Sequence, residues 1–173
     1  DKPTGEPSVD KLTNFIVEPF TPHTQEEEYY VSATCVGDDD VIYMSAEGGI
    51  AIEENWDAKV TEVAFPITAT EEEIASAIRA NVPADVADKD KKAFAEFCIG
   101  FFKAYRELNF AYLEINPFVM QGNKIELLDM VAKLDDTAGF MMVDQWGDVE
   151  YPTAFGMEAK SPEVEAIEEA DAK

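Results

Sequence analysis

Short runs of mainly apolar residues, bounded by turn-forming residues, recur along the first part of the chain and are typical of β-strands. The clearest such segments cover residues 28–36 and 41–46, which are rich in β-branched and aromatic side chains and are separated by three consecutive aspartates. We therefore predict a β-hairpin. A short strand over residues 14–18, stopped by a proline, and a further strand over residues 60–67 are also predicted, and the glycine pair 48–49 is expected to break the strand pairing directly after the hairpin.

Two later segments carry apolar residues at spacings of three and four, the period of an amphipathic helix. Residues 71–80 follow Thr70, which forms a capping-box pattern with Glu73. Residues 89–108 place a set of mostly aromatic residues on one face, namely Phe94, Phe97, Cys98, Phe101, Tyr105 and Leu108. We predict two helices, the second with an aromatic face that belongs to the core.

The period changes to two after the second helix. Residues 112–116 are predicted to form a strand that ends at Pro117, and residues 125–129 a returning strand beyond a turn at residues 121–123, continued by residues 131–134. Together the elements predict an α/β (α+β) fold, in which an antiparallel sheet carries the two helices on one face.

The chain is expected to hold one globular domain, because 46% of its 173 residues are hydrophobic and 11% are aromatic. The domain is placed at residues 11–145, with residues 1–10 as a linker or cut edge and residues 146–173 as an irregular tail. No apolar run reaches the roughly 20 residues of a membrane span, and the start lacks the pattern of a signal peptide. A cytoplasmic setting fits, with Cys35 and Cys98 as buried, reduced thiols.

The composition is strongly acidic, since 13 Lys and Arg residues stand against 37 Asp and Glu residues and give a formal charge of −24. Nucleic acid is therefore a poor partner. Most of these carboxylates are explained by solubility or by adaptation to salt. The charge still constrains the chemistry, because a polyphosphate would be repelled unless Mg²⁺ or cationic groups from elsewhere neutralised it.

Three oxygen-bearing side chains are expected to meet at one end of the second hairpin. Asn116 lies six residues before Gly122 and Asp129 seven residues after it, so the two face one another across the strands, and Glu114 shares the face of Asn116. Amide and carboxylate oxygens suit Mg²⁺. The spacing alone favours the alternative of a polar residue before a proline and a solvated acid on an edge strand.

Four segments in order carry a resemblance to a known family. They are residues 15–23, the stretch from Tyr112-Leu113-Glu114-Ile115-Asn116-Pro117 to the run Leu128-Asp129-Met130-Val131-Ala132-Lys133, residues 146–152, and Asp171-Ala172-Lys173. The chain resembles the ATP-grasp domains of the succinyl-CoA synthetase β-subunit superfamily, and within it the ATP-citrate lyase family most closely. The fold that this implies is the C-terminal subdomain of an ATP-grasp fold.

The resemblance also implies roles for individual residues. The backbone of a hinge reads adenine, and its residues are Glu18, Pro19, Phe20 and Thr21. Glu28 matches the acid that binds the ribose hydroxyls, with Glu27 as the fallback if the register slips. Asn116 and Asp129 match the residues that hold Mg²⁺, supported by Glu114, and Asp171 matches a further metal ligand.

The parent enzyme implied by this family forms acetyl-CoA and oxaloacetate from citrate, CoA and ATP through a phosphohistidine and citryl-CoA. The phosphate-facing lysines, the citrate and CoA regions and the partner bearing the phosphorylated histidine lie outside this sequence, so the fragment alone is expected to be inactive and its parent oligomeric. His23, the single histidine, is interpreted as structural. A citryl-CoA or succinyl-CoA synthetase β-subunit and a non-catalytic acidic interaction module remain the alternatives.

Overall fold

The computed structural model describes residues 15–122, 124–147 and 162–171, and its chain divides into two compact units. One unit is Phe20–Gly147 and contains the sheet. The other combines Asp1–Pro19 with Asp148–Lys173. In the described part of the second unit, α5 (Pro162–Asp171) is a helix and residues 15–19 form no helix or strand.

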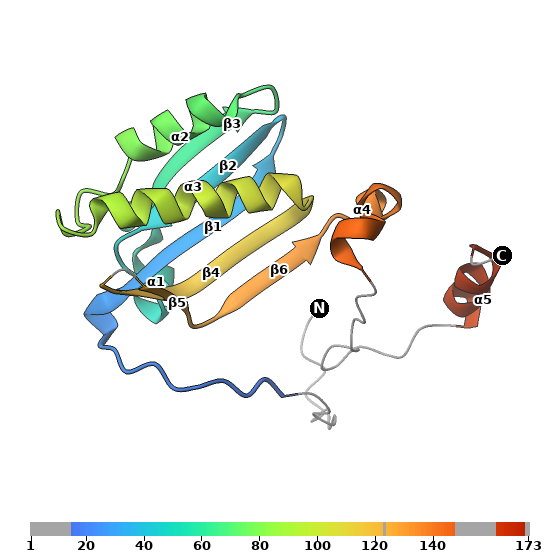
Figure 1. Cartoon of the computed structure of the whole chain (residues 1–173), viewed down its shortest axis with the longest axis horizontal. Coiled ribbons are helices and arrows are strands. Elements are labelled where there is room, and N and C mark those ends of the chain that lie inside the picture. Colours follow the sequence, from blue (N-terminus) through green and yellow to red (C-terminus); the bar gives the residue numbers. More distant parts are fainter. Residues whose placement is uncertain (1–14, 123, 148–161, 172–173) are drawn as a thin grey trace. The chain divides into compact units, whose positions relative to one another are not determined.

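The larger unit is built on a six-stranded antiparallel sheet (Figure 1). Its strands are β1 (Glu28–Val36), β2 (Asp39–Ser45), β3 (Thr61–Pro66), β4 (Phe110–Gln121), β5 (Lys124–Leu127) and β6 (Met130–Leu134). The order is β3-β2-β1-β4-β5, and β6 also pairs with β4. The predicted first hairpin is confirmed as β1 and β2, and the predicted strand over residues 60–67 as β3.

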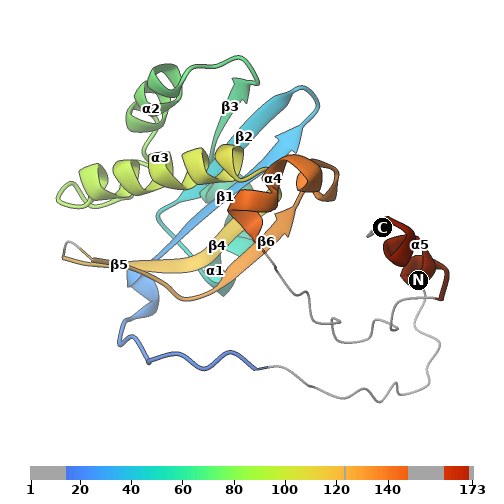
Figure 2. The same cartoon turned by 45° about the vertical axis from the view of Figure 1, so that its right-hand side comes forward.

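Two helices cover one face of this sheet, as the turned view in Figure 2 also shows. They are α2 (Glu71–Ala80) and α3 (Lys91–Glu107), which confirms the predicted α+β arrangement. At the start of α2 the Thr70 hydroxyl accepts a hydrogen bond from the Glu73 backbone N–H, while the Glu73 carboxylate accepts one from the Thr70 N–H. Of the predicted aromatic face of α3, Phe94, Cys98, Phe101 and Tyr105 are buried in the core, and Phe102, which was not predicted, is buried beside them.

The opposite face of the sheet carries a helix that the sequence analysis did not predict. This helix is α1 (Ile50–Lys59), and its Trp56 ring packs against Tyr30 and Tyr43. Both tyrosines alternate along their strands with residues that face α3, so they point the other way. The helix escaped prediction because its short apolar run reads equally well as strand, and its backbone is interrupted at Asn55.

Three other sequence expectations were wrong. Residues 15–18 form no strand, and their apolar side chains, such as Ile16 and Val17, are exposed. The tail over residues 146–173 is not irregular throughout, because α5 forms within it, and α4 (Gly139–Trp146), which leads into the tail, was not predicted. Cys98 is buried as expected, but Cys35 is exposed near the end of β1.

A hydrogen bond from Trp146 anchors the C-terminal helix of the larger unit. The Trp146 indole N–H donates to the Leu108 carbonyl, so α4 packs where α3 passes into β4.

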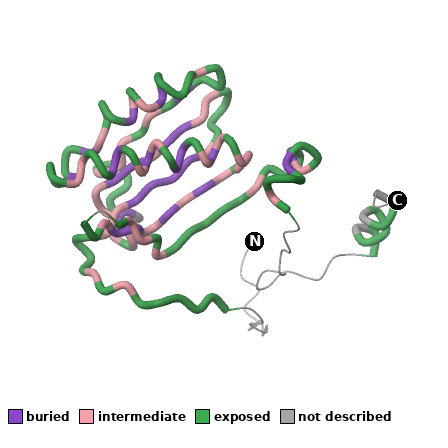
Figure 3. Tube along the Cα trace, viewed as in Figure 1, coloured by how far each residue is buried: buried purple, intermediate pink, exposed green. Residues whose placement is uncertain are grey.

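Burial is concentrated in the central strands and on the sheet-facing side of α3, whereas β6 is largely exposed (Figure 3). Among the residues described, no helix combines the length and the apolar character needed to cross a bilayer.

Candidate functional site

The second hairpin is interrupted at Pro117. The strand was predicted to end at Pro117, but β4 continues through a cis Asn116–Pro117 peptide to Gln121. Because proline has no N–H to donate, the opposite strand loses regular pairing and splits into β5 and β6. The Pro117 carbonyl accepts the N–H groups of Leu128 and Asp129 at 3.0 and 3.4 Å.

Asn116 and Asp129 lie at this interruption. The Asn116 N–H donates to the Asp129 carbonyl at 3.1 Å, and the flanking pairs Ile115–Met130 and Phe118–Leu127 show that the register is continuous across it. The two residues therefore stand opposite one another, as the spacing predicts, and directly opposed residues share a face. Asp129 is exposed and Asn116 half-buried.

The Asn116 and Asp129 side chains each have a backbone partner. The Asn116 Oδ1 accepts the Gly49 N–H at 2.6 Å, and the Asp129 Oδ1 accepts the Met130 N–H at 2.9 Å. Each oxygen keeps further lone pairs. One amide and one carboxylate make a partial ligand set that fits Mg²⁺, which keeps several positions for water and phosphate oxygens. No group of three or more His, Cys, Asp or Glu suited to a metal occurs within the described ranges.

Glu114 shares the face of Asn116 and is held by two phenols. Its Oε2 accepts hydrogen bonds from the hydroxyls of Tyr30 at 2.9 Å and Tyr112 at 2.6 Å. Burial, reinforced by the bond to Glu114, raises the pKa of Tyr112 to about 12, and burial raises the pKa of Tyr30 as well. Both phenols therefore stay protonated as donors. The predicted support of Asn116 by Glu114 remains a prediction.

Glu28, the first residue of β1, is fixed on both sides of its carboxylate. Its Oε1 lies 3.2 Å from His23 Nε2, and the same imidazole lies 2.7 Å from the Thr21 carbonyl through Nδ1. Its Oε2 lies against Gly49, so closely that a Cβ at that position would overlap it. Glu28 is thereby enclosed between the segment that precedes β1 and the loop that follows β2.

The glycine pair Gly48–Gly49 connects the two groups of candidate residues. A Cβ at Gly48 would lie 2.7 Å from the Tyr29 carbonyl oxygen and 2.9 Å from the Pro117 Cβ. Gly49 touches Glu28 and donates its N–H to Asn116. Sequence reasoning gave these glycines only the role of breaking a strand. Their adjacency was the available signal, because paired glycines often mark a close approach of backbone to another group.

The segment before β1 is anchored at two further points. Gln121, at the end of β4, donates to the Pro22 carbonyl at 2.8 Å. Glu27 accepts the Thr24 N–H at 2.8 Å and closes the short 3₁₀ turn Gln25–Glu27. The Glu27 carboxylate is thus engaged in a local turn and exposed, while Glu28 faces inward toward His23 and Gly49.

The structure thus brings four predicted site residues into one region of the larger unit. Thr21, Glu28 and Asn116 are linked through His23 and Gly49, and Asp129 is joined to Asn116 by the backbone hydrogen bond between their strands. Phe20 belongs to the same unit, and its side chain is 84% exposed. Glu18, Pro19 and Asp171 belong to the other unit, and the Asp171 side chain lies outside the described part of the structure.

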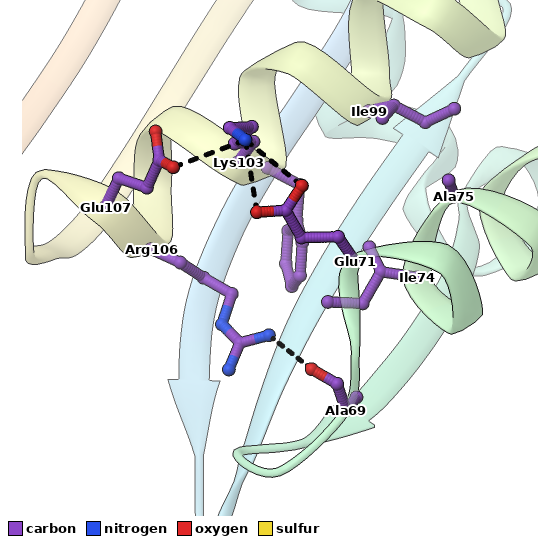
Figure 4. A pocket seen from close by; sticks show the side chains of 9 residues that line it. Ala69, Glu71, Ile74, Ala75, Ile99, Lys103, Arg106 and Glu107 are labelled. Atoms are coloured by element: carbon purple, nitrogen blue, oxygen red, sulfur yellow. Dashed lines mark hydrogen bonds and ion pairs between the residues drawn. The ribbon is translucent and has the colours of Figure 1, made fainter.

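Several cavities lie outside this linked set. One of about 500 Å³ adjoins Gly48, and its Lys59 is paired with Glu47 at 2.7 Å and Asp85 at 3.1 Å. Another of about 460 Å³ lies between α2 and α3, where Lys103 bridges Glu71 and Glu107 and the floor is apolar (Figure 4). None of the predicted nucleotide or metal residues lines the second cavity.

Comparison with known proteins decides the family. The model for the ATP-citrate synthase ATP-grasp domain matches residues 5–146. The chain belongs to this family. Among its ATP-citrate synthase relatives, the Bos taurus protein is 38% identical over 164 residues, which cover 94% of this chain and 14% of that protein. Alpha chain protein 1 from Arabidopsis thaliana is 40% identical over 146 residues, 84% of this chain and 33% of that protein.

Solved structures agree with the assignment to the ATP-citrate synthase ATP-grasp family. ATP citrate lyase from Methanothrix soehngenii, in complex with citrate and coenzyme A, matches with a TM-score of 0.74 and 34% identity, over 90% of this chain and 35% of that one. The ATP citrate lyase of Methanosaeta concilii with (3S)-citryl-CoA matches with a TM-score of 0.71 and 32% identity. The predicted resemblance and ATP-grasp fold are confirmed, and the chain spans about a third of these structures.

Proposed function

We propose that this chain supplies the Mg²⁺-ATP-binding portion of an ATP-citrate lyase, which forms acetyl-CoA and oxaloacetate from citrate, CoA and ATP by way of a phosphohistidine and citryl-CoA. The observation that carries the proposal is the linkage of Glu28 to Asn116 through Gly49. A ribose-binding acid and a metal-binding amide must lie within the span of one nucleotide, and Gly49 contacts both candidates.

Each residue has a role suited to its surroundings. Backbone groups of residues 18–21 read the adenine edge, and the Glu28 carboxylate accepts the ribose hydroxyls. Asn116 and Asp129 hold Mg²⁺ from facing strands, with Asp171 as a further proposed ligand. When bound, the metal neutralises phosphate charge. The two protein oxygens act by position and charge, which suits a chain with a net charge of −24 that could not attract polyphosphate by itself.

The complete enzyme requires groups from elsewhere. Other regions of the same protein or a partner subunit supply the phosphorylated histidine, the citrate and CoA sites and the cations that face the phosphates, so an oligomer is proposed. The chain alone should not catalyse the reaction. A cytoplasmic setting is proposed as well, supported by the two cysteines being unpaired thiols.

Asp129→Asn in the full-length enzyme tests the metal role. The variant removes one charge and should reduce citrate-dependent acetyl-CoA formation by about 100-fold or more, because a misplaced metal forfeits several kcal/mol of charge stabilisation. The measurement is turnover at a series of Mg²⁺ concentrations, with circular dichroism to confirm the fold. Asp144→Asn is the matched control, since Asp144 is exposed on α4 and loses the same charge.

Two outcomes would contradict the proposal. Normal turnover in Asp129→Asn at every Mg²⁺ concentration would remove Asp129 from the metal site, and an equal loss in Asp144→Asn would trace the effect to charge alone. Product analysis of the unmodified enzyme separates the reaction classes, because release of citryl-CoA without acetyl-CoA and oxaloacetate would identify a citryl-CoA synthetase instead.

A further inference from the structure

Both ring nitrogens of His23 face atoms that can only accept hydrogen bonds. Nδ1 lies 2.7 Å from the Thr21 carbonyl oxygen, and Nε2 lies 3.2 Å from the Glu28 Oε1. A neutral imidazole carries one N–H, so one of its nitrogens would present a lone pair to one of these oxygens. Only the imidazolium, with an N–H on each nitrogen, satisfies both contacts while Glu28 is ionised.

We propose that His23, as an imidazolium, is a positioning residue that joins the adenine-reading hinge to the ribose-binding acid. It holds the Glu28 carboxylate in place through one nitrogen and the backbone of Thr21 through the other. The ligand class that this arrangement selects is a ribonucleotide with free 2′- and 3′-hydroxyls. The inference rests on the proposed function and gives His23, so far regarded as structural, a part in nucleotide selection.

The surroundings of His23 favour the charged form. The bond to the Thr21 carbonyl, followed by the bond to Glu28 and the negative charges of Glu28 and Glu27, raises the pKa of His23 above its ordinary value, although partial burial opposes this. The side chains of His23 and Glu28 are 19% and 16% exposed, so the pair is shielded from solvent yet remains within reach of a ligand.

A single hydrogen bond from His23 is enough to fix the Glu28 carboxylate, because Gly49 blocks its movement on the other side. Gly49 occupies the space beside Oε2, so the carboxylate cannot swing in that direction. His23 restrains Oε1, and Glu28 begins β1, whose backbone pairs with β4 at Val119. Without His23 the carboxylate would be free to rotate toward solvent. Its oxygens would then no longer face one fixed point, and acceptance of two neighbouring hydroxyls depends on that alignment.

The test compares two nucleotides on the full-length enzyme. Dissociation constants are measured for Mg-ATP and for Mg-2′,3′-dideoxy-ATP, which lacks the ribose hydroxyls. The unmodified enzyme should prefer ATP by about 10-fold or more, the range of hydrogen bonds to a charged acceptor. His23→Phe should reduce that preference to the value found for Glu28→Gln, and it should weaken dideoxy-ATP binding, through loss of the Thr21 contact, less than it weakens ATP binding. The preference of His23→Gln, which keeps one hydrogen-bond donor, should lie between those of the unmodified enzyme and His23→Phe.

The pH dependence gives an independent measurement. Because the pKa of His23 is raised, the preference for ATP should be complete in the acidic range and should fall as the pH rises through that pKa. His23→Gln should show no such step. Thermal unfolding of each variant, measured alongside, shows whether it is folded.

The outcomes separate the two proposals. If His23→Phe and His23→Gln weaken the binding of both nucleotides equally, or if neither variant changes the preference for ATP, the positioning role is overturned. The proposed ATP site is not affected by either result. A pH step that persists in His23→Gln would overturn it too. If the unmodified enzyme binds no Mg-ATP, or binds both nucleotides equally, the proposed ribose site itself fails and the role of His23 falls with it.

Discussion

Gly49→Ala is the substitution that most directly tests how the site is assembled. Gly49 has a φ of 61° and a ψ of −145°, a backbone conformation that residues with a Cβ rarely adopt. Holding alanine there costs on the order of 1–3 kcal/mol. The new Cβ would also overlap the Glu28 carboxylate, and any movement that relieves the overlap displaces the N–H that Asn116 accepts.

Gly37→Ala separates these two effects. Gly37 has a similar φ of 64°, but a Cβ there would meet no atom within 4 Å. Its cost should be confined to the backbone, about 1–2 kcal/mol. The loss of stability in Gly49→Ala should exceed that in Gly37→Ala by about 1–3 kcal/mol. The additional loss arises because the new Cβ overlaps the Glu28 carboxylate and the hydrogen bond from Gly49 to Asn116 is lost.

Urea denaturation followed by circular dichroism measures the free energy of unfolding of both variants. Nucleotide binding to the full-length enzyme provides a second measurement, which Gly49→Ala should weaken and Gly37→Ala should leave unchanged. Equal losses of stability in the two variants would refute the reasoning, since they would show that the overlap with Glu28 is relieved at no cost. Unchanged nucleotide binding in Gly49→Ala would refute the link between the loop and the site.

Three further substitutions or treatments test the fold. Phe102→Ala should lower the free energy of unfolding by about 3–5 kcal/mol, because Phe102 is fully buried; a loss below about 1 kcal/mol in urea denaturation would contradict its place in the core. Thr70→Ala should cost about 1 kcal/mol by removing the cap of α2, and unchanged stability would show that the cap contributes nothing. A thiol reagent followed by mass spectrometry should modify the exposed Cys35 and spare Cys98, whose pKa burial raises; equal reaction rates in the folded protein would contradict the burial of Cys98.

The regular elements could be predicted where the local sequence pattern was clear. The strands over residues 28–36 and 41–46 are rich in β-branched and aromatic residues with a turn between them, and the helix α3 has an apolar period of three to four, so local patterns were enough to place them. The strand expected at residues 14–18 has the right composition, but a strand exists only where another pairs with it, and composition carries no information about a partner.

Some contacts of the candidate site could be predicted from local sequence patterns and others could not. The opposition of Asn116 and Asp129 follows from counting residues on either side of a turn, so hairpin geometry could predict it. The contact of Gly49 with Asn116 joins residues 67 positions apart, and no local pattern specifies such a contact. His23 and Glu28 are only five residues apart, yet a short 3₁₀ turn lies between them, and neither the strand period nor the period of an α-helix applies to it.

The turn between Gln121 and Lys124 has a consequence for how this family can vary. The pairing of β4 with the opposite strands keeps one register from Gln121–Lys124 through the Pro117 interruption to Ile115–Met130. A single residue inserted into the turn would shift this register by one, and each residue of the returning strand would then face the other side of the sheet. Asp129 would point away from Asn116. The length of a distant turn therefore decides whether Asn116 and Asp129 can form the proposed metal pair, so insertions in this turn should be tolerated only in steps that restore the alignment.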